Sequence, residues 1–140
     1  MLQRTLTFIK PDAMNDGHVG EIVSMIEAAG FHLVAAKIQC LAKDDAERFY
    51  EVHRGKDFFE GLIEYASSGP ILALCIEKDD AIEDLRSLVG VTNPKEAAEG
   101  TIRALFGHTV RKNAIHASDG TTTAEREIRF FFPEIEARLF

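Results

Sequence analysis

The sequence feature that most limits the fold is an unbroken apolar run, ILALCI, at residues 71–76. The Ser-Ser-Gly-Pro cluster at residues 67–70 is typical of a turn and separates this run from the preceding segment. The run is far too short to cross a bilayer, and its length favours a strand. Because successive side chains of a strand point to opposite faces, both faces of this strand are apolar. We therefore expect it to be a central strand of a sheet, not an edge strand.

Strand and helix patterns alternate along the rest of the chain. Residues 5–9 alternate with period two, and Pro11 ends that strand at Lys10. Apolar residues then recur at helical spacing over residues 19–26, and Gly30 is placed to end that helix. The further elements expected are a β-rich segment at 31–41, short helices at 44–50 and 57–66, a helix that starts at Asp79 and Asp80 and carries Ile82, Leu85 and Val89, and a last helix at about 121–132 that ends at Pro133.

This order of elements predicts one domain, residues 1–140, of the α+β class. No repeat, low-complexity tract or linker divides the chain, and its length suits one hydrophobic core. The natural fit is a ferredoxin-like split βαβ sandwich, in which helices on one face cover a four-stranded antiparallel sheet. Segment 90–112 carries Gly and Pro and is expected to be mainly a long loop before the last short strand. Long loops in small domains are usually functional.

Composition and charge exclude several classes of function. The net charge is −7, which argues against a nucleic-acid-binding surface but not against a small polyanion, because only the local field matters there. No signal peptide or membrane span is visible, so the expected location is cytoplasmic. Cys40 and Cys75 lie far apart without a metal-ligand pattern, and we expect both to be reduced, buried core residues.

Two charged residues interrupt the apolar patterns. Glu127 falls on the same face of the last helix as Ile128 and Phe131, where a carboxylate is unfavourable unless it is hydrogen-bonded. It is either a side chain that reaches solvent from the edge of this face or a carboxylate that orients a histidine. Lys10 stands at the end of a strand, where it is either a solvated charge or a contact to a ligand.

The best-placed histidine is His116, in the segment NAIHASD at residues 113–119. A histidine beside apolar residues is most often a satisfied core or surface residue. A neutral imidazole is nevertheless a competent nucleophile toward phosphorus when a carboxylate or hydroxyl fixes the ring. Phosphoryl transfer also needs cations at the transferring oxygens, and the guanidinium groups of Arg86 and Arg103 suit that task. Phe58 either stacks on a base or packs at the edge of the core.

Taken together, these residues resemble the nucleoside diphosphate kinase family. Residues 113–119 resemble its active-site signature, usually written Asn-x-x-His-Gly-Ser-Asp, and residues 5–12 (TLTFIKPD) resemble its first strand. Further matching segments follow in the family's order: Tyr50, residues 57–59 (DFF), 67–71 (SSGPI), 90–94 (GVTNP) and 100–103 (GTIR). The resemblance runs from about Arg4 to Phe132, and the short tail after Pro133 is similar to that of bacterial members. No P-loop, dinucleotide-binding or nucleophile-elbow motif occurs.

The resemblance implies a role for each matching residue. His116 is implied to be the nucleophile, phosphorylated on Nδ1. Glu127 and Ser118 are implied to hold and assist its ring, and Tyr50 to help to position both the phosphate and this histidine. The implied nucleotide contacts fall into three groups. Lys10 and Asn113 are implied to contact the ribose, and Lys10 also lies near the terminal phosphate. The residues implied at the phosphates are Arg86, Thr92, Arg103 and His53, and those on either side of the base are Phe58 and Val110.

The resemblance also implies the reaction and its partners. It is a reversible ping-pong transfer: a nucleoside triphosphate gives its γ-phosphoryl group to the enzyme, and a nucleoside diphosphate then takes it, with little base specificity. The implied substrates are ATP, GTP, NDPs and dNDPs, and Mg²⁺ is implied to be bound mainly by the nucleotide phosphates, not by a metal site of the protein. The family forms homo-oligomers, tetramers or hexamers built from dimers. We expect neither a membrane nor a specific nucleic-acid partner.

Two positions depart from the family pattern. Ala117 stands where a glycine usually follows the histidine, and it would be strained if that position needs a positive φ. Gly120 replaces a serine that would cap the last helix, and Thr122 with Glu125 offers a capping box instead.

Two other functions stay open at this point: a non-catalytic nucleotide-binding module on the same fold, and a phosphorelay carrier that would also use a histidine.

Overall fold

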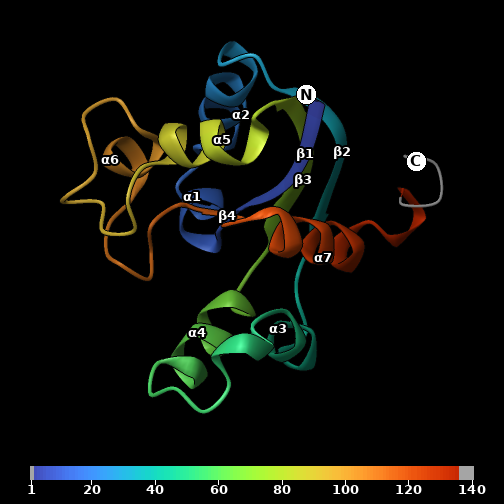
Figure 1. The fold of residues 1–140 in the computed structure, drawn as a ribbon. Helices are drawn as coiled ribbons and strands as arrows, with labels where there is room; N and C mark the ends of the chain where they lie inside the picture. Colours follow the sequence, from blue (N-terminus) through green and yellow to red (C-terminus); the bar gives the residue numbers. More distant parts are fainter. Residues whose placement is uncertain (1, 136–140) are drawn as a thin grey trace.

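A computed structural model describes residues 2–135 of the chain. Its centre is a four-stranded antiparallel sheet with strand order β2-β3-β1-β4 (Figure 1). The strands are β1 (Leu2–Ile9), β2 (His32–Gln39), β3 (Ile71–Asp79) and β4 (Ile115–Ala117). The helices are α1 (Pro11–Asn15), α2 (Val19–Ala28), α3 (Lys43–Phe49), the 3-10 helix η1 (Glu51–His53), α4 (Phe59–Ala66), α5 (Ala81–Val89), α6 (Ile102–Phe106) and α7 (Thr121–Phe131). The predicted α+β fold with a four-stranded antiparallel sheet is confirmed.

The strand β3 lies between β2 and β1, as its apolar sequence predicts. Every side chain over residues 71–76 is buried. Ile71 and Ala73 join one cluster of core residues, whereas Leu72 and Leu74 join the other, because successive side chains of a strand point to opposite faces. The sheet therefore separates two hydrophobic cores.

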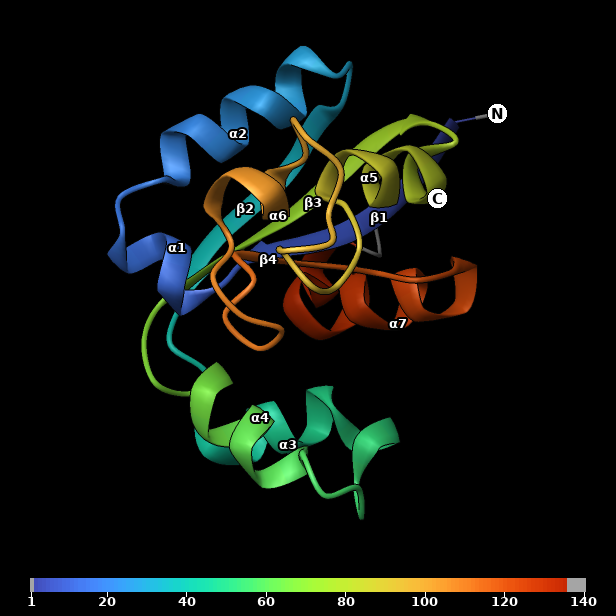
Figure 2. The ribbon, with the colours of Figure 1, turned by 90° about the vertical axis from the view of Figure 1, so that its left-hand side faces the viewer.

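Helices cover both faces of the sheet (Figure 2). On one face α2 and α5 contribute Ile26 and Leu85 to the core, and on the other α7 and α3 contribute Phe131 and Phe49. The prediction that the helices lie on one face was therefore wrong. The physical reason is the apolar composition of β3: a central strand that is apolar on both sides leaves one side in contact with water unless a second layer of helices covers it.

Two short α-helices, α1 and α6, and the 3-10 helix η1 occupy segments that the sequence did not mark as helical. The helix α1 begins at Pro11, whose fixed φ and missing N–H suit the first position of a helix. The helix α6 lies inside the predicted long loop, and Thr101 caps it by accepting a hydrogen bond at Oγ1 from the backbone N–H of Ala104. The other residues of segment 90–112 form neither helix nor strand.

Two smaller expectations were wrong in part. Cys75 is fully buried, and burial raises the pKa of its thiol to about 11, but Cys40 is exposed because it follows the end of the edge strand β2. The helix α7 has Gly120 as its N-cap, so the capping box expected from Thr122 and Glu125 does not form. Over residues 2–135, no helix has both the length and the apolar character needed to span a membrane.

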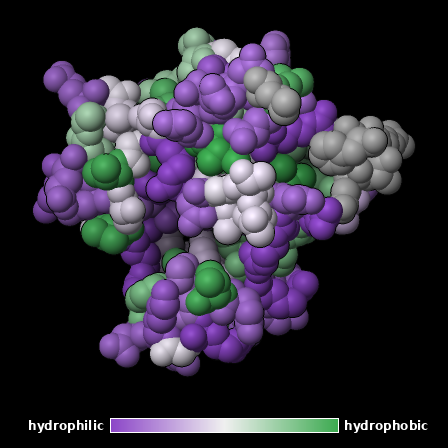
Figure 3. Space-filling model, viewed as in Figure 1, coloured by the Kyte–Doolittle hydropathy of each residue, from purple (hydrophilic) through white to green (hydrophobic). Residues whose placement is uncertain are grey.

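The backbone of the α3–α4 hairpin, residues 43–66, projects beyond the end of the sheet (Figure 1), while Phe49 and Ile63 of the hairpin join the core on the α7 face. In the space-filling view the surface is hollowed between this hairpin and the rest of the molecule (Figure 3). We call this feature the hollow. In the ribbon view β4 and α7 lie on one side of the hollow and the hairpin lies on the other (Figure 1). The rings of His116 in β4 and Phe49 in α3 are in contact.

Candidate active site

His116 lies in the middle of β4, paired with Phe8 of β1. Its imidazole stacks on the Phe8 ring, with 4.8 Å between the ring centroids, and meets the Phe49 ring edge-on at 5.3 Å. The backbone carbonyl of His116 accepts a hydrogen bond from Thr7 Oγ1 at 2.6 Å. These contacts fix the ring, while 19% of the side chain stays exposed and open to a ligand.

Glu127 completes the support of the imidazole. Its Oε1 atom lies 2.7 Å from His116 Nε2 and 2.6 Å from Ser118 Oγ. Because a carboxylate accepts both bonds, Nε2 carries a proton, and in the neutral imidazole Nδ1 is then the nitrogen with the lone pair. Glu127 is 7% exposed and therefore does not reach solvent from the edge of α7.

The backbone of Ala117 is outside the left-handed region, so the alanine that stands where the family usually has glycine causes no strain at this position.

Lys10 ends β1, but it is not a solvated charge, because only 9% of it is exposed. Its Nζ donates a hydrogen bond to Asn113 Oδ1 at 2.8 Å. Asn113 Nδ2 donates in turn to the carbonyl groups of Thr92 and Val110, each at 2.9 Å, which ties the ammonium group to the long loop. Burial, together with the positive charge of Arg103, lowers the pKa of Lys10 to about 8.

Arg103, on α6, connects the long loop to β4. Its Nη1 donates to the carbonyl of Gly90 at 2.9 Å and its Nη2 to the carbonyl of Ile115 at 2.8 Å. Its buried Nε has no hydrogen-bond partner among residues 2–135. Burial and the nearby charge of Arg86 lower the pKa of Arg103 to about 10, so it stays a cation at neutral pH. Gly90 has φ 94°, and a Cβ there would lie 2.7 Å from Thr101 Oγ1, so this turn requires glycine.

Tyr50, His53 and Phe58 form a row of rings on the α3–α4 hairpin. The ring centroids are 6.2 Å apart for Tyr50 and His53 and 5.3 Å apart for His53 and Phe58. Burial, and then the charge of Glu127, raise the pKa of Tyr50, which therefore stays protonated. Burial also lowers the pKa of His53 and favours its neutral form. Phe58 is 45% exposed and Val110 57% exposed, so both offer apolar surface to a ligand.

The structure thus places the predicted residues in two connected groups. The first lies on the sheet, α5, α7 and the long loop: Lys10, Arg86, Thr92, Arg103, Val110, Asn113, His116, Ser118 and Glu127. The second lies on the hairpin: Tyr50, His53 and Phe58. Phe49 joins the groups, because its ring packs against both His116 and Tyr50. His116 is close enough to His53 for its charge to add to the effect of burial that lowers the pKa of His53.

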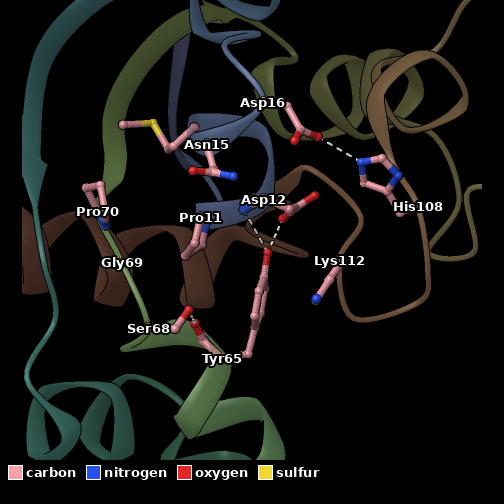
Figure 4. A pocket seen from close by; sticks show the side chains of 11 residues that line it. Pro11, Asp12, Asn15, Asp16, Tyr65, Ser68, Gly69, Pro70, His108 and Lys112 are labelled. Atoms are coloured by element: carbon pink, nitrogen blue, oxygen red, sulfur yellow. Dashed lines mark hydrogen bonds and ion pairs between the residues drawn. The ribbon is translucent and has the colours of Figure 1, made fainter.

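A separate cavity of about 810 Å³ lies next to this site (Figure 4). Its walls come from α1, from the end of α4 and the turn that follows it, and from the long loop near His108 and Lys112. None of the residues predicted to bind nucleotide lines it. Asp12 and Tyr65 stand in its wall and are hydrogen-bonded to each other.

Sequence reasoning missed the residues that support the site. Phe8 and Phe49 enclose the imidazole, and the alternating pattern of β1 could have placed Phe8 on a buried face. Asp12 was passed over, although an acidic residue in the first turn of a helix that starts with Pro11 is a recognisable signal. Its Oδ2 accepts a hydrogen bond from the backbone N–H of Ala114 at 3.0 Å.

A histidine with one ring nitrogen bound to a carboxylate, beside buried cations and exposed apolar side chains, is the arrangement expected of a nucleotide phosphotransferase. Comparison with known proteins leads to a particular family. The family model described as "Nucleoside diphosphate kinase" matches residues 3–137. The chain belongs to the nucleoside diphosphate kinase family.

Individual relatives agree with this assignment. The chain is 48% identical over 131 residues to "Nucleoside diphosphate kinase 2" of Protochlamydia amoebophila, covering 94% of this chain and 92% of the relative. It is 49% identical over 134 residues to a nucleoside diphosphate kinase of Francisella tularensis, covering 96% of each. Among solved structures, the Aquifex aeolicus nucleoside diphosphate kinase has a TM-score of 0.93 and 43% identity, with 94% and 96% coverage of the two chains. That of Halobacterium salinarum in complex with CDP has a TM-score of 0.91 and 37% identity, with 94% and 88% coverage.

The lowered pKa of Lys10 predicts that nucleotide binding weakens as the pH rises through about 8. A polyanion favours the protonated amine, so the pKa of Lys10 is higher in the complex, and binding takes up a proton above pH 8. Nucleotide phosphates do not titrate above pH 8, because their last ionisation lies at about pH 6. Isothermal titration calorimetry between pH 7 and 9 should show a rising dissociation constant, with a slope that approaches roughly tenfold per pH unit.

The matched variant is Lys10→Arg, whose guanidinium keeps its charge over this range. We expect its dissociation constant to vary much less with pH. The same slope in both proteins would show that another group causes the dependence.

Proposed function

We propose that this chain transfers phosphoryl groups between nucleotides through a covalent phosphohistidine on Nδ1 of His116. The observation that carries the proposal is the bond between Glu127 and Nε2, because it leaves the Nδ1 lone pair as the free nucleophile of a fixed ring. The family assignment supports the same reaction, since relatives of 48% and 49% identity are called nucleoside diphosphate kinases.

The reaction runs in two matching halves. Nδ1 attacks the γ-phosphorus of a nucleoside triphosphate in line with the leaving diphosphate. The Nδ1–P bond forms while the bond from phosphorus to the bridging oxygen breaks, and its electron pair leaves with the diphosphate. The imidazole becomes positively charged, and the carboxylate of Glu127 at Nε2 stabilises that charge. A second diphosphate then attacks the phosphohistidine and reverses these steps.

The residues around His116 provide the binding contacts in this proposal. The phosphates are contacted by Arg86, Arg103, Thr92, His53 and Tyr50. The positive charges of the two arginines reduce the negative charge on the transferring oxygens. Lys10 and Asn113 contact the ribose hydroxyls, and Lys10 also lies near the terminal phosphate. Phe58 and Val110 enclose the base, and their exposed apolar side chains support this role. Stacking accepts any base, which explains low base specificity.

We propose that Mg²⁺ enters with the nucleotide. Within residues 2–135, no group of three acidic or histidine side chains is arranged to hold a metal ion, whereas Mg²⁺ in kinases is bound largely by substrate phosphates and water. When bound, Mg²⁺ neutralises part of the phosphate charge. Lys10, Arg86 and Arg103 would hold the phosphate oxygens that the ion leaves free.

The two other candidate functions explain fewer features of the site. A non-catalytic binding module does not require a buried Glu127 bound to Nε2 of an accessible histidine. A phosphorelay carrier leaves the exposed Phe58 and the pairing of Lys10 with Asn113 without a purpose.

One domain over residues 1–140 is supported by the family match to residues 3–137. The cytoplasmic location and the lack of membrane and nucleic-acid partners stay predictions from the sequence.

Incubation with γ-labelled ATP should label the protein at His116, with a bond that is labile to acid and stable to base. Addition of any nucleoside diphosphate should remove the label and yield the corresponding labelled triphosphate. The His116→Ala variant should bind ATP but take up no label. Labelling of His116→Ala to the wild-type level, or intact ATP binding without any label in the wild type, would contradict the proposal.

We also propose that the chain forms a homo-oligomer built from dimers that meet at β2. This strand is at the edge of the sheet, and among the strands of residues 2–135 it pairs with β3 alone. Leu33 and Ile38 on it are 41% and 66% exposed, and an edge strand with exposed apolar side chains favours association. The mass of the assembly distinguishes a tetramer of two dimers from a hexamer of three. The short tail that resembles bacterial members lies largely outside the described residues.

Sedimentation at micromolar concentration should show an assembly of four or six chains for the wild type. Ile38→Glu places a charge in the proposed interface and should shift the distribution toward monomer. Val52→Glu, at a residue that is 78% exposed on the hairpin, is the matched control and should leave the mass unchanged. A monomeric wild type, or equal masses for all three proteins, would overturn the proposed interface.

A further inference from the structure

Asp12, Tyr65 and Ala114 form a hydrogen-bonded group that links α1, α4 and the turn before β4. The hydroxyl of Tyr65 donates to Asp12 Oδ1 and accepts from the backbone N–H of Asp12 at 2.9 Å (Figure 4). The other carboxylate oxygen, Asp12 Oδ2, accepts from the backbone N–H of Ala114 at 3.0 Å. None of the three residues has a part in the proposed reaction.

Ala114 has an unusual backbone conformation. Its φ is 75°, in the left-handed region that residues with a Cβ seldom occupy, because the Cβ comes too close to the following carbonyl oxygen. The N–H of Ile115 donates to the carbonyl of Asn113 at 3.0 Å, which closes a γ-turn around Ala114. Such a conformation persists only where the surrounding structure holds it.

The segment that holds this turn is residues 10–12. The N–H of Ala114 is bound by Asp12 Oδ2, and its carbonyl accepts from the backbone N–H of Lys10 at 2.8 Å. Tyr65 binds the Asp12 carboxylate from the hairpin side and so fixes the acceptor. Burial and the hydrogen bond to Asp12 raise the pKa of Tyr65, so the phenol keeps the proton that it donates.

The turn sets the direction of the residues on either side of it. Asn113 comes before it, and its side chain binds Lys10 Nζ at 2.8 Å. Ile115 comes after it, and its carbonyl accepts from Arg103 Nη2 at 2.8 Å. His116 is the next residue. A change of Ala114 to a negative φ would rotate Asn113 and Ile115 relative to each other and move the contacts of both cations.

We propose that Tyr65 is a positioning residue of the phosphoryl-transfer site, which acts through Asp12 to keep Ala114 in its left-handed conformation. Among the described residues, the side chain of Tyr65 is hydrogen-bonded to Asp12 and has no hydrogen bond or ring contact to His116 or to the predicted nucleotide contacts, so its effect passes through the backbone of the turn. Because Tyr65 belongs to α4, the same bonds also connect the hairpin that carries Phe58 to the strand that carries His116. This inference rests on the proposed function of His116.

The variant Tyr65→Phe removes the hydroxyl and keeps the ring. We expect the rate constant for phosphorylation of His116 by ATP in single-turnover experiments to fall by roughly tenfold. Hydrogen exchange at the Ala114 amide should become faster, because its acceptor is no longer fixed. Ser68→Ala is the matched control: it removes another hydrogen bond of this segment, from Ser68 Oγ to the carbonyl of Tyr65, and should leave both readouts unchanged.

The decisive test is rescue by Ala114→Gly. Glycine adopts a positive φ without the steric penalty of a Cβ, so the turn no longer needs the support of Asp12 and Tyr65. The double variant Tyr65→Phe/Ala114→Gly should recover the wild-type phosphorylation rate to within about threefold. A purely structural role of the hydroxyl in the docking of α4 would not respond to a change at residue 114.

A second pair of variants covers the case in which Tyr65→Phe does not fold. Asp12→Ala should lower the phosphorylation rate, and Ala114→Gly should restore that rate. Asp12→Asn keeps an acceptor for the Ala114 N–H and should retain most of the wild-type phosphorylation rate. Wild-type rates in Tyr65→Phe and Asp12→Ala, or reduced rates that Ala114→Gly does not restore, would overturn the inference. An unlabelled His116 in the wild type would instead overturn the proposed function, while the exchange at Ala114 would still test the turn.

Discussion

The hydrogen bond between Glu127 and His116 is the interaction on which the site depends. A carboxylate on the buried face of α7 would destabilise the fold if it had no partners, and here it accepts from both His116 and Ser118. The same bonds join α7 to β4 and assign the ring proton to Nε2. Phe8 and Phe49 enclose the ring on its other sides. One buried acid thus orients the proposed nucleophile and leaves a single ring nitrogen free.

The cations of the site are held in place before any nucleotide arrives. Lys10 and Arg103 are both largely buried, and neither forms an ion pair with a carboxylate within residues 2–135. Backbone carbonyl groups and Asn113 fix them instead, and the pKa values of both are lowered. Positive charges that are desolvated and already oriented interact strongly with a polyanion and need little rearrangement during transfer. Exposed pairs such as Arg54 with Glu51 contribute far less.

Long periodic segments of the fold could be predicted from the sequence. The strand β3 and the helix α2 follow directly from apolar patterns, and Glu127 could be singled out because it breaks one. The helices α1 and α6 are too short to show a period, and Cys40 looks like a core residue only until β2 proves to be an edge strand. A second layer of helices was missed because sequence patterns show which face is apolar but not what covers it.

The support of the site was harder to predict than its reactive groups. His116, Lys10 and the arginines belong to recognisable segments, whereas the bonds from Tyr65 to Asp12 and from Asp12 to Ala114 join residues that are far apart in sequence. A left-handed alanine has no sequence signature, since alanine favours helices. Such features depend on tertiary contacts and become visible only in the folded chain.

The central claim is that Glu127, by binding Nε2, directs the phosphoryl group to Nδ1 of His116. NMR spectroscopy of the ¹⁵N-histidine-labelled protein after reaction with ATP tests this directly, because coupling between phosphorus and nitrogen identifies the ring atom that carries the group. We expect coupling to Nδ1 of His116 alone. A phosphoryl group on Nε2, or on any other residue, would contradict the claim.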